Sequence, residues 1–454
     1  MSSSSYEDST STEESKVEEL LQSKLKVGSL KIKGYRRTNP SFLHSLIAPS
    51  LSGDNFREVI ENLSVAIERL RELDIFKGVD VYLDESSVPD QTDVLVTVSE
   101  KGRLQLRLGT SVEKEGFETG LETCATLRNI FGKAERLRLE AGTEGTDLGR
   151  GYGIAEFYKP HAFGYDTFFS AYLNRQYFQE KQRSHQETSR GLVASLGFPE
   201  TWGIFSYEGA WREIRVTEPS ASSTIREEAG LSFKSSIKHS YEIDSRDNVQ
   251  APIQGNLFSV HSELAGLGGN VRYLRQQLET QLHIPIADTE ASWGIACRLG
   301  YLYTPKSYSS TVLDRFYLGG PNSFRGFQTR GVGPWEKEDP LGGELFYTIF
   351  SSLSIPLGVK GVLGNLFQPR AHIFATVGDI SSVKESQSVL GQVFTRKAPW
   401  KNLFETTRIS VGLGLVADTQ LGRLELNYCH VLRRTVGDRP YSGIVQFGIS
   451  KSFG

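Results

Sequence analysis

Beyond Lys101 the sequence repeats one pattern, and this pattern restricts the fold more than any other feature of the chain. Apolar residues occupy alternate positions, with charged residues, polar residues or glycine between them, as at residues 104–108, 136–141, 409–415, 423–428 and 445–453. A period of two is typical of β-strands, because successive side chains point to opposite faces of a sheet. We count about sixteen such segments in one stretch, which predicts a large antiparallel sheet.

Two environments produce this alternation. In a water-soluble sandwich the apolar face packs in a core, whereas in a membrane barrel the apolar face meets lipid and the polar face lines the lumen. The number of segments, with no helical pattern between them, favours a mostly β protein with a transmembrane antiparallel β-barrel of about 16 strands. The 38% hydrophobic content and the lack of an apolar run of about 18 residues exclude a bundle of membrane helices.

The N-terminal part of the chain has a different composition. Residues 1–25 begin with a stretch rich in Ser, Thr, Glu and Asp, which predicts a disordered tail and lacks the basic and apolar regions of a secretory signal. Residues 26–100 predict the order strand, helix, helix, strand, strand, and Asn39-Pro40 and Asn55 are suited to begin the two helices. We expect a small α+β domain at residues 26–100, followed by the barrel at residues 101–454.

The most specific motif is Phe-Tyr-Leu-Gly-Gly-Pro-Asn-Ser-Phe-Arg-Gly-Phe at residues 316–327, followed by Gly-Val-Gly-Pro at residues 331–334. An arginine in a narrow lumen requires a carboxylate partner, because an unpaired buried charge is costly. Gly326 permits close approach of the backbone, and Phe327 supplies packing area. Taken alone, Arg-Gly-Phe would indicate no more than a glycine-rich surface turn with a solvated arginine.

With its flanking residues, this motif resembles the sixth extracellular loop of the β-barrel assembly superfamily, whose members combine POTRA domains with an outer-membrane barrel. Asp-Ser-Arg-Asp-Asn at residues 244–248 is similar to a hairpin motif of that superfamily. Leu-Gly-Gly-Glu at residues 341–344 resembles the core barrel subunit of the mitochondrial sorting and assembly machinery in particular. The resemblance implies one POTRA domain at residues 26–100. It also implies that the loop folds back into the barrel with these motif residues against the inner wall: Gly319, Gly320, Arg325, Gly326 and Phe327.

The sequence departs from the family pattern at one strand after the loop. Many bacterial members have Phe-x-Asp-x-Gly there, and in this chain Thr376 takes the place of the aspartate. We therefore seek the partner of Arg325 among Glu344 and Asp379, and favour Glu344.

The resemblance implies an insertase that folds and inserts β-barrel precursor proteins into the mitochondrial outer membrane. The POTRA domain would lie in the intermembrane space, membrane lipids would surround the barrel, and peripheral accessory subunits would bind it. Precursors would enter through a lateral gate, the seam between the first and last barrel strands, which glycine weakens because it has no side chain to pack. The expected gate residues are Leu104, Leu106, Leu108, Gly443, Phe447 and Gly448.

Other functions remain open from the sequence. A polypeptide translocation pore of the same superfamily, of the plastid-envelope or two-partner-secretion type, would pass its substrate through the lumen. A passive metabolite channel would need neither the front domain nor the inserted loop, and a soluble β enzyme would need a catalytic motif, of which we find none. The net charge of −3 offers no basic footprint for nucleic acid, and three distant cysteines and eight scattered histidines give no metal-binding spacing. We therefore expect no enzymatic activity, no cofactor, no metal and no nucleic-acid partner.

Overall fold

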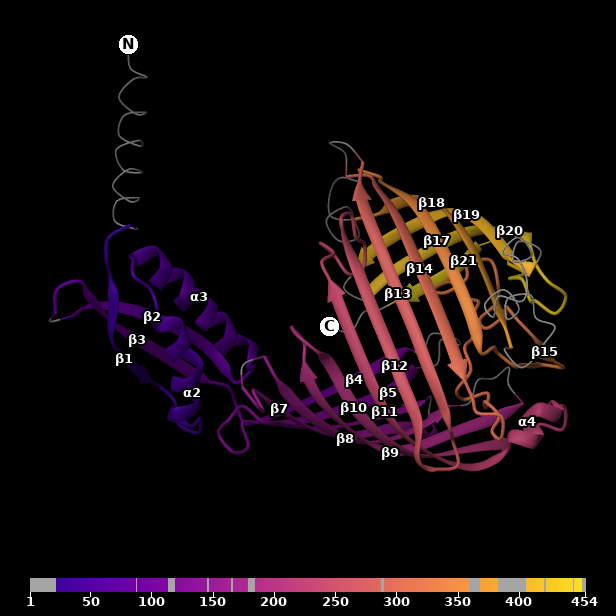
Figure 1. Ribbon diagram of the computed structural model, residues 1–454, viewed down its shortest axis with the longest axis horizontal. Coiled ribbons are helices and arrows are strands. Elements are labelled where there is room, and N and C mark those ends of the chain that lie inside the picture. The colour runs from indigo at the N-terminus through magenta and orange to yellow at the C-terminus, as the bar shows by residue number, and fades with distance from the viewer. Residues whose placement is uncertain are drawn as a thin grey trace, which may run out of the picture. The chain divides into compact units, whose positions relative to one another are not determined.

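The computed structural model describes residues 22–86, 88–112, 119–144, 147–164, 166–178, 184–286, 290–358, 368–382, 406–419, 422–443 and 445–450 (Figure 1). The chain divides into two compact units. The first contains Met1–Ser111, Gly120–Gly142 and Gly153–Tyr172, and the second contains Val112–Thr119, Thr143–Tyr152 and Leu173–Gly454. The described helices include none that is long and apolar enough to cross a membrane.

The first unit begins with a three-stranded sheet and two α-helices. Its elements are β1 (Lys26–Lys33), α2 (Pro40–Ile47), η1 (Ala48–Leu51), α3 (Phe56–Glu72), β2 (Phe76–Glu85) and β3 (Gln91–Glu100), and the sheet order is β1-β3-β2. The predicted order of strand, helix, helix, strand, strand is confirmed, with a 3-10 turn after the first helix.

Local signals define the long helix α3. The side chain of Asn55 accepts a hydrogen bond from Glu58 N at 2.9 Å, and Glu58 Oε2 accepts one from Asp54 N at 3.0 Å. These bonds satisfy backbone donors that have no partner within the helix. The apolar face of α3 then packs on the sheet in a core that includes Leu43, Val59, Leu63, Leu70, Val94 and Val96.

This small sheet is joined to the first strands of the large sheet by polar contacts within the same unit. Asp74 accepts hydrogen bonds from Arg128 Nε and Nη2 at 3.1 and 3.0 Å and pairs with Lys101. Asn129 Nδ2 donates to Thr38 Oγ1 at 2.8 Å. The expected domain boundary at residue 101 falls between β3 and the next strand, while the compact unit itself continues past it.

The remaining strands form one antiparallel sheet of sixteen, in the order β21-β20-β19-β18-β17-β14-β13-β12-β11-β10-β9-β8-β7-β6-β5-β4. The strands in the N-terminal half are β4 (Leu104–Val112), β5 (Thr119–Arg128), β6 (Arg136–Glu144), β7 (Asp147–Pro160), β8 (Phe168–Phe178), β9 (His185–Phe198), β10 (Gly203–Val216) and β11 (Gly230–Asp244). Those in the C-terminal half are β12 (Gly255–Gly269), β13 (Tyr273–Pro285), β14 (Ser292–Tyr303), β17 (Leu345–Pro356), β18 (Arg370–Ser381), β19 (Arg408–Thr419), β20 (Gly422–Arg433) and β21 (Val445–Ser450). The mostly β fold with sixteen antiparallel strands is as predicted, and β4 and β21 are the two ends of the sheet order.

On these strands the apolar side chains are exposed and the polar side chains are buried, which is the reverse of the pattern in a water-soluble protein. On β20, Leu426 and Tyr428 are 46% and 50% exposed, whereas Glu425 and Asn427 between them are 2% and 0% exposed. On β19, Leu413 and Leu415 are likewise exposed, and Ser410 is buried. A wall of leucine is unfavourable in water but suits lipid, so the exposure pattern excludes the soluble sandwich and indicates a membrane sheet.

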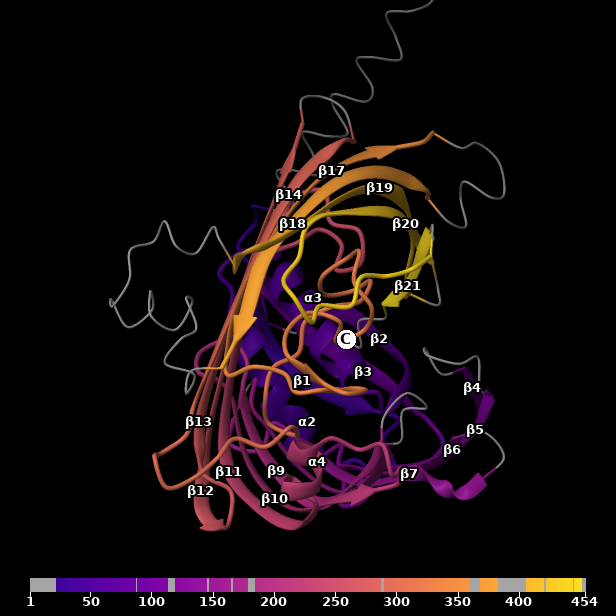
Figure 2. The ribbon, with the colours of Figure 1, turned by 90° about the vertical axis from the view of Figure 1, so that its right-hand side faces the viewer.

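The long segment between β14 and β17 contains the short strands β15 (Trp335–Glu336) and β16 (Asp339–Pro340). Within the second unit, the strands curve around this segment (Figure 2). It carries the motif at residues 316–327.

Candidate functional site

The segment between β14 and β17 folds into a compact loop because its glycines adopt conformations that other residues avoid. Gly319, Gly320 and Gly326 have φ values of +120°, +100° and +87°. A Cβ on Gly319 would lie 2.4 Å from Gln328 O, so a larger residue could not occupy this turn. Phe324 and Phe327 are fully buried and pack edge to face with their ring centroids 5.2 Å apart.

Arg325 lies between these two aromatic residues in the sequence and is only 7% exposed. Its Nε and Nη2 each donate to the carboxylate of Glu425 on β20 at 2.9 Å. Its guanidinium also lies over the ring of Phe350, 4.5 Å from the centroid, and over that of Phe374. A two-pronged bond to a carboxylate with stacking on aromatic rings uses the planar guanidinium in a way that lysine could not reproduce.

The prediction that Glu344 or Asp379 binds Arg325 is wrong. Glu344 accepts hydrogen bonds from Ser310 and Ser382, and Asp379 pairs with Arg408. The partner is Glu425, which lies on the buried polar face of β20. All three carboxylates are buried, so the choice among them depends on where the loop tip meets the wall.

The backbone of the loop tip is bound to strands β19 and β21. Gln446 on β21 accepts a hydrogen bond from Gly326 N at 3.0 Å through Oε1 and donates one to Phe327 O at 2.9 Å through Nε2. Ser410 Oγ on β19 donates to Arg325 O at 2.6 Å. Gln446 thus satisfies two backbone groups of the tip with one side chain.

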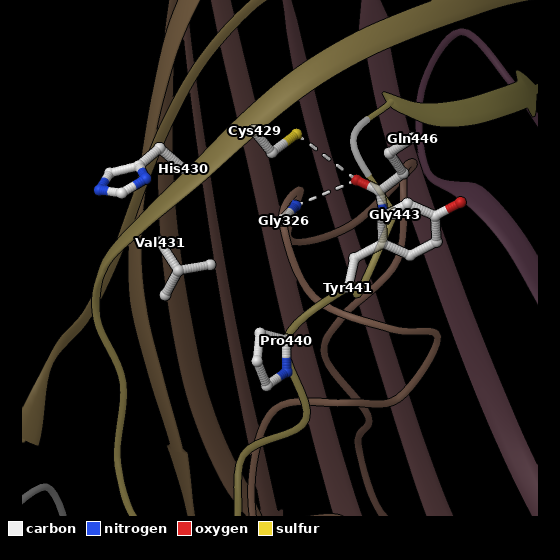
Figure 3. Close-up of a pocket in the computed structure, with 8 residues that line it drawn as sticks. All are labelled: Gly326, Cys429, His430, Val431, Pro440, Tyr441, Gly443 and Gln446. Atoms are coloured by element: carbon white, nitrogen blue, oxygen red, sulfur yellow. Dashed lines mark hydrogen bonds between the residues drawn. The ribbon is translucent and has the colours of Figure 1, made fainter.

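A cavity of about 210 Å³ lies beside this contact (Figure 3). It is lined by Gly326, Cys429, His430, Val431, Pro440, Tyr441, Gly443 and Gln446. Gly443, expected at the gate, therefore lies at this cavity on the segment that leads into β21.

The opposite part of the loop segment is held by a second set of ion pairs and hydrogen bonds. Arg212 on β10 binds both carboxylate oxygens of Asp314 at 2.6 and 3.2 Å. Arg315 binds Glu228 of α4 (Ser223–Glu228) at 2.9 Å, and Asp339 accepts a hydrogen bond from Ser222 N at 2.9 Å. The segment therefore spans from β10 and α4 to β19–β21, fixed at both sides by buried charges.

Apart from Gly443, the predicted gate residues lie on the two terminal strands of the sheet order. Leu104, Leu106 and Leu108 of β4 are strongly exposed, and Phe447 of β21 is half exposed. Gly448 faces inward, where a Cβ would lie 2.8 Å from Pro321 Cβ in the loop. Over the described part of the chain, β21 pairs with β20 through six residue pairs. The apolar residue Phe453, part of the last alternating segment, lies outside the described residues.

Sequence reasoning missed three residues of the site: Glu425, Gln446 and Ser410. Each occupies a polar position in an alternating strand, and each is almost fully buried. Their place on the polar face was the available signal, but many other residues share it.

Comparison with known proteins agrees with this geometry. The Omp85 superfamily domain matches residues 129–453. The chain is 34% identical to the Sorting and assembly machinery component 50 homolog of Xenopus tropicalis over 98% of this chain and 94% of that one, and 34% identical to the Homo sapiens homolog over 96% and 92%. Its fold is similar to that of BamA from Haemophilus ducreyi lacking POTRA domains 1–3, with a TM-score of 0.74 and 16% identity over 93% of this chain and 84% of that one. The chain therefore belongs to the Omp85 superfamily and, within it, to the family of sorting and assembly machinery component 50 homologues.

Proposed function

We propose that this protein folds and inserts β-barrel precursor proteins into the mitochondrial outer membrane through a lateral gate between β4 and β21. The name of its relatives, sorting and assembly machinery component 50 homolog, supports the assembly role. In this proposal residues 26–100 are a POTRA domain in the intermembrane space, the sixteen-stranded sheet closes into a barrel, and peripheral accessory subunits bind it.

The observation that carries the proposal is that β4 and β21 are the two ends of the sheet order, with the inserted loop bound to the inner face of β21 through Gln446. Gly448 has no side chain to pack against its neighbours, which weakens the strand that carries it, so the gate is placed at the seam that includes β21.

An open seam would expose the backbone N–H and C=O groups of β4. In lipid each such group costs several kcal/mol while it lacks a partner, and a precursor strand would supply those partners by β-augmentation. The exposed leucines of β4 would meanwhile keep their contact with lipid. Further hairpins of the precursor would then add to the first, and no cofactor takes part.

Depletion tests the function itself. Cells that depend on this chain as their only such protein are depleted of it, and the assembly of several unrelated outer-membrane barrels is followed with time. We expect all of them to assemble slowly. Loss of a single exported cargo with normal barrel assembly would contradict the insertase and favour a translocation pore.

Covalent closure tests the gate. Leu106→Cys and Phe447→Cys are joined by a short bismaleimide, and precursor assembly is measured before and after the reaction. The matched control joins Leu413→Cys to Tyr428→Cys, two lipid-facing partners on adjacent strands β19 and β20. We expect assembly to stop only when the seam is joined, and a normal rate with the seam joined would exclude this gate.

A further inference from the structure

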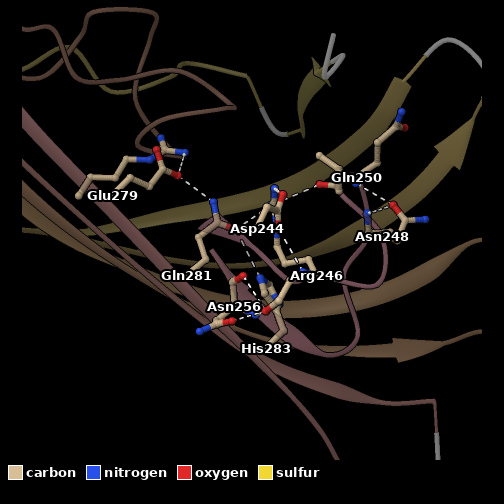
Figure 4. Close-up of polar contacts among 12 residues, drawn as sticks. Asp244, Arg246, Asn248, Gln250, Asn256, Glu279, Gln281 and His283 are labelled. Carbon is tan, nitrogen blue, oxygen red and sulfur yellow. Dashed lines mark hydrogen bonds and ion pairs between the residues drawn. The ribbon is translucent and has the colours of Figure 1, made fainter. Parts of the chain in front are cut away.

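The turn between β11 and β12, residues 245–254, is built by the Asp-Ser-Arg-Asp-Asn motif (Figure 4). Asp244 binds Arg246 through two hydrogen bonds of 2.8 and 2.6 Å. Asp247 Oδ1 accepts hydrogen bonds from the backbone N–H groups of residues 253 and 254, and Asn248 Oδ1 accepts them from residues 250 and 251. The motif's own side chains therefore fix the shape of the turn.

This turn contacts strands that lie far away in the sheet. Asn248 Nδ2 donates to Asp418 Oδ2 on β19 at 2.8 Å, and Arg423 Nη1 on β20 donates to Gln250 O at 2.8 Å. Strands β13, β14, β17 and β18 separate β12 from β19 in the sheet order. Contacts between such distant strands must cross the inner side of the curved sheet.

A small cavity beneath the turn shows the same arrangement. Ala251 and Pro252 form one side of it, and Arg370, His372 and Arg423 of β18 and β20 form the other. Its volume is about 30 Å³, so little free space is left between the turn and these strands.

Arg423 connects this turn with the loop tip. While Nη1 binds the turn backbone, Nε donates to Glu425 Oε1 at 2.6 Å. Glu425 is the carboxylate that holds Arg325. The two segments that cross the inner side of the sheet, one from each end of the strands, thus meet on a single strand, β20, which is the neighbour of β21.

We propose that Arg423 is a positioning residue that couples the turn at 245–254 to the Arg325 loop tip through Glu425, and so keeps β20 in place while β21 separates from β4. This role rests on the proposed insertase function. The guanidinium is suited to it because Nε and Nη1 point in different directions and are held in one plane, whereas the single ammonium of lysine cannot occupy both places. The acceptor in the turn is the backbone carbonyl of residue 250. The contact therefore depends on where the turn lies and not on which side chain residue 250 carries.

The first experiment measures the coupling without reference to activity. In the full chain carrying Cys124→Ala, Cys297→Ala and Cys429→Ala, the pair Ala251→Cys and Val416→Cys reports the turn's position by its rate of disulfide formation, because both residues line the small cavity and neither side chain takes part in the hydrogen bonds described above. Arg423→Gln is expected to lower this rate about tenfold, as for loss of one charge-assisted hydrogen bond, and Arg423→Lys less so.

The matched control is Arg215→Gln. Arg215 binds Glu213, two residues away on β10, at 2.9 Å, which repeats the spacing of Arg423 and Glu425 away from the turn. Arg215→Gln should leave the rate of disulfide formation unchanged. If Arg423→Gln and Arg215→Gln give the same rate as the unsubstituted chain, the coupling does not exist and the proposal is overturned.

The second experiment asks whether position is what matters for assembly. Arg423→Gln should slow precursor assembly several-fold, and forming the disulfide between residues 251 and 416 beforehand should restore it until the disulfide is reduced. The amount of folded protein in the membrane is measured for every variant, and Arg423→Lys serves if Arg423→Gln does not fold. Slow assembly that the disulfide fails to restore would overturn the positioning role. Failure of the depletion test would instead refute the insertase, and the disulfide rate would still decide whether Arg423 holds the turn.

Discussion

Glu425→Gln is expected to loosen the loop tip more than Arg325→Gln, although the two residues form one ion pair. Glu425 binds two cations, Arg325 and Arg423, and also accepts a hydrogen bond from Asn427 at 2.8 Å. When Arg325 is removed, Glu425 keeps Arg423. When Glu425 is removed, both arginines lose their carboxylate, and Arg325 is left buried between Phe350 and Phe374.

The magnitude follows from burial. Removing one member of a buried ion pair costs about 3–5 kcal/mol, chiefly because the other charge remains without compensation. The side chain of Arg325 is 9% exposed and that of Arg423 is 23% exposed, so water relieves the second only in part. We expect about 3 kcal/mol for Glu425→Gln and about half of that for Arg325→Gln. At about 1.4 kcal/mol for each factor of ten, Glu425→Gln raises the population with a detached tip about a hundredfold and Arg325→Gln about tenfold.

Cys429 provides the assay because it lines the cavity beside Gly326. Its rate of alkylation by a maleimide in membranes, followed by mass spectrometry, should rise with the detached population, and Cys297 on β14 serves as the internal reference. The variant with both substitutions should react more slowly than Glu425→Gln alone, since it no longer buries an uncompensated Arg325. If Arg325→Gln accelerates alkylation as much as Glu425→Gln, or if the two effects simply add, the reasoning is refuted.

Two further predictions concern other parts of the chain. Gly448→Val should slow precursor assembly several-fold, because its Cβ would lie 2.8 Å from Pro321. The control Gly109→Val on β4, where a Cβ meets nothing within 4 Å, should not slow assembly. Equal assembly rates for the two variants would contradict this prediction. Burial raises the pKa of Glu100, but hydrogen bonds from Thr38 and from the backbone N–H groups of residues 36–38 outweigh this and lower the pKa to about 2 from 4.5. Because the folded-state pKa is the lower one, the stabilisation by Glu100 is complete above about pH 4.5 and is lost as the pH falls towards 2. Above pH 4.5, amide hydrogen exchange of β3 should therefore be slower in the unsubstituted chain than in Glu100→Gln, and this difference should vanish towards pH 2. A difference in exchange rate that does not depend on pH would show the reasoning to be wrong.

The elements of the fold were predictable because their signals are local. The helix after Asn55 is determined by a cap and a capping box within four residues, and each strand by an alternation that continues over its own length. The count of sixteen strands followed from repeating that reading, and no contact between distant residues was needed.

The partner of Arg325 was not predictable, because the signals in the sequence are local and this contact joins residues that are far apart in the chain. Alternation tells which face a residue occupies, and it placed Glu425 on the polar face of its segment. It does not tell at what height along the sheet a loop tip one hundred residues away will lie, because that depends on the register of every intervening strand. In the fold Asp379 pairs instead with Arg408, which also binds Asp438. The turn at 245–254 shows the same limit, since its motif was recognisable but its contacts with β19 and β20 were not.

The last strand is stabilised from its inner face as well as from its edge. The Gln446 side chain faces the loop and binds the backbone of its tip. The Cα of Gly448 also faces the loop, and the lack of a side chain there leaves space for Pro321. The backbone N–H and C=O groups that would pair with β4 or with a precursor lie instead in the plane of the sheet. A loop on the inner side can therefore hold β21 without competing for the groups that an incoming strand must use. In the proposed cycle β21 can therefore separate from β4 and still be held by the loop as well as by its neighbour β20.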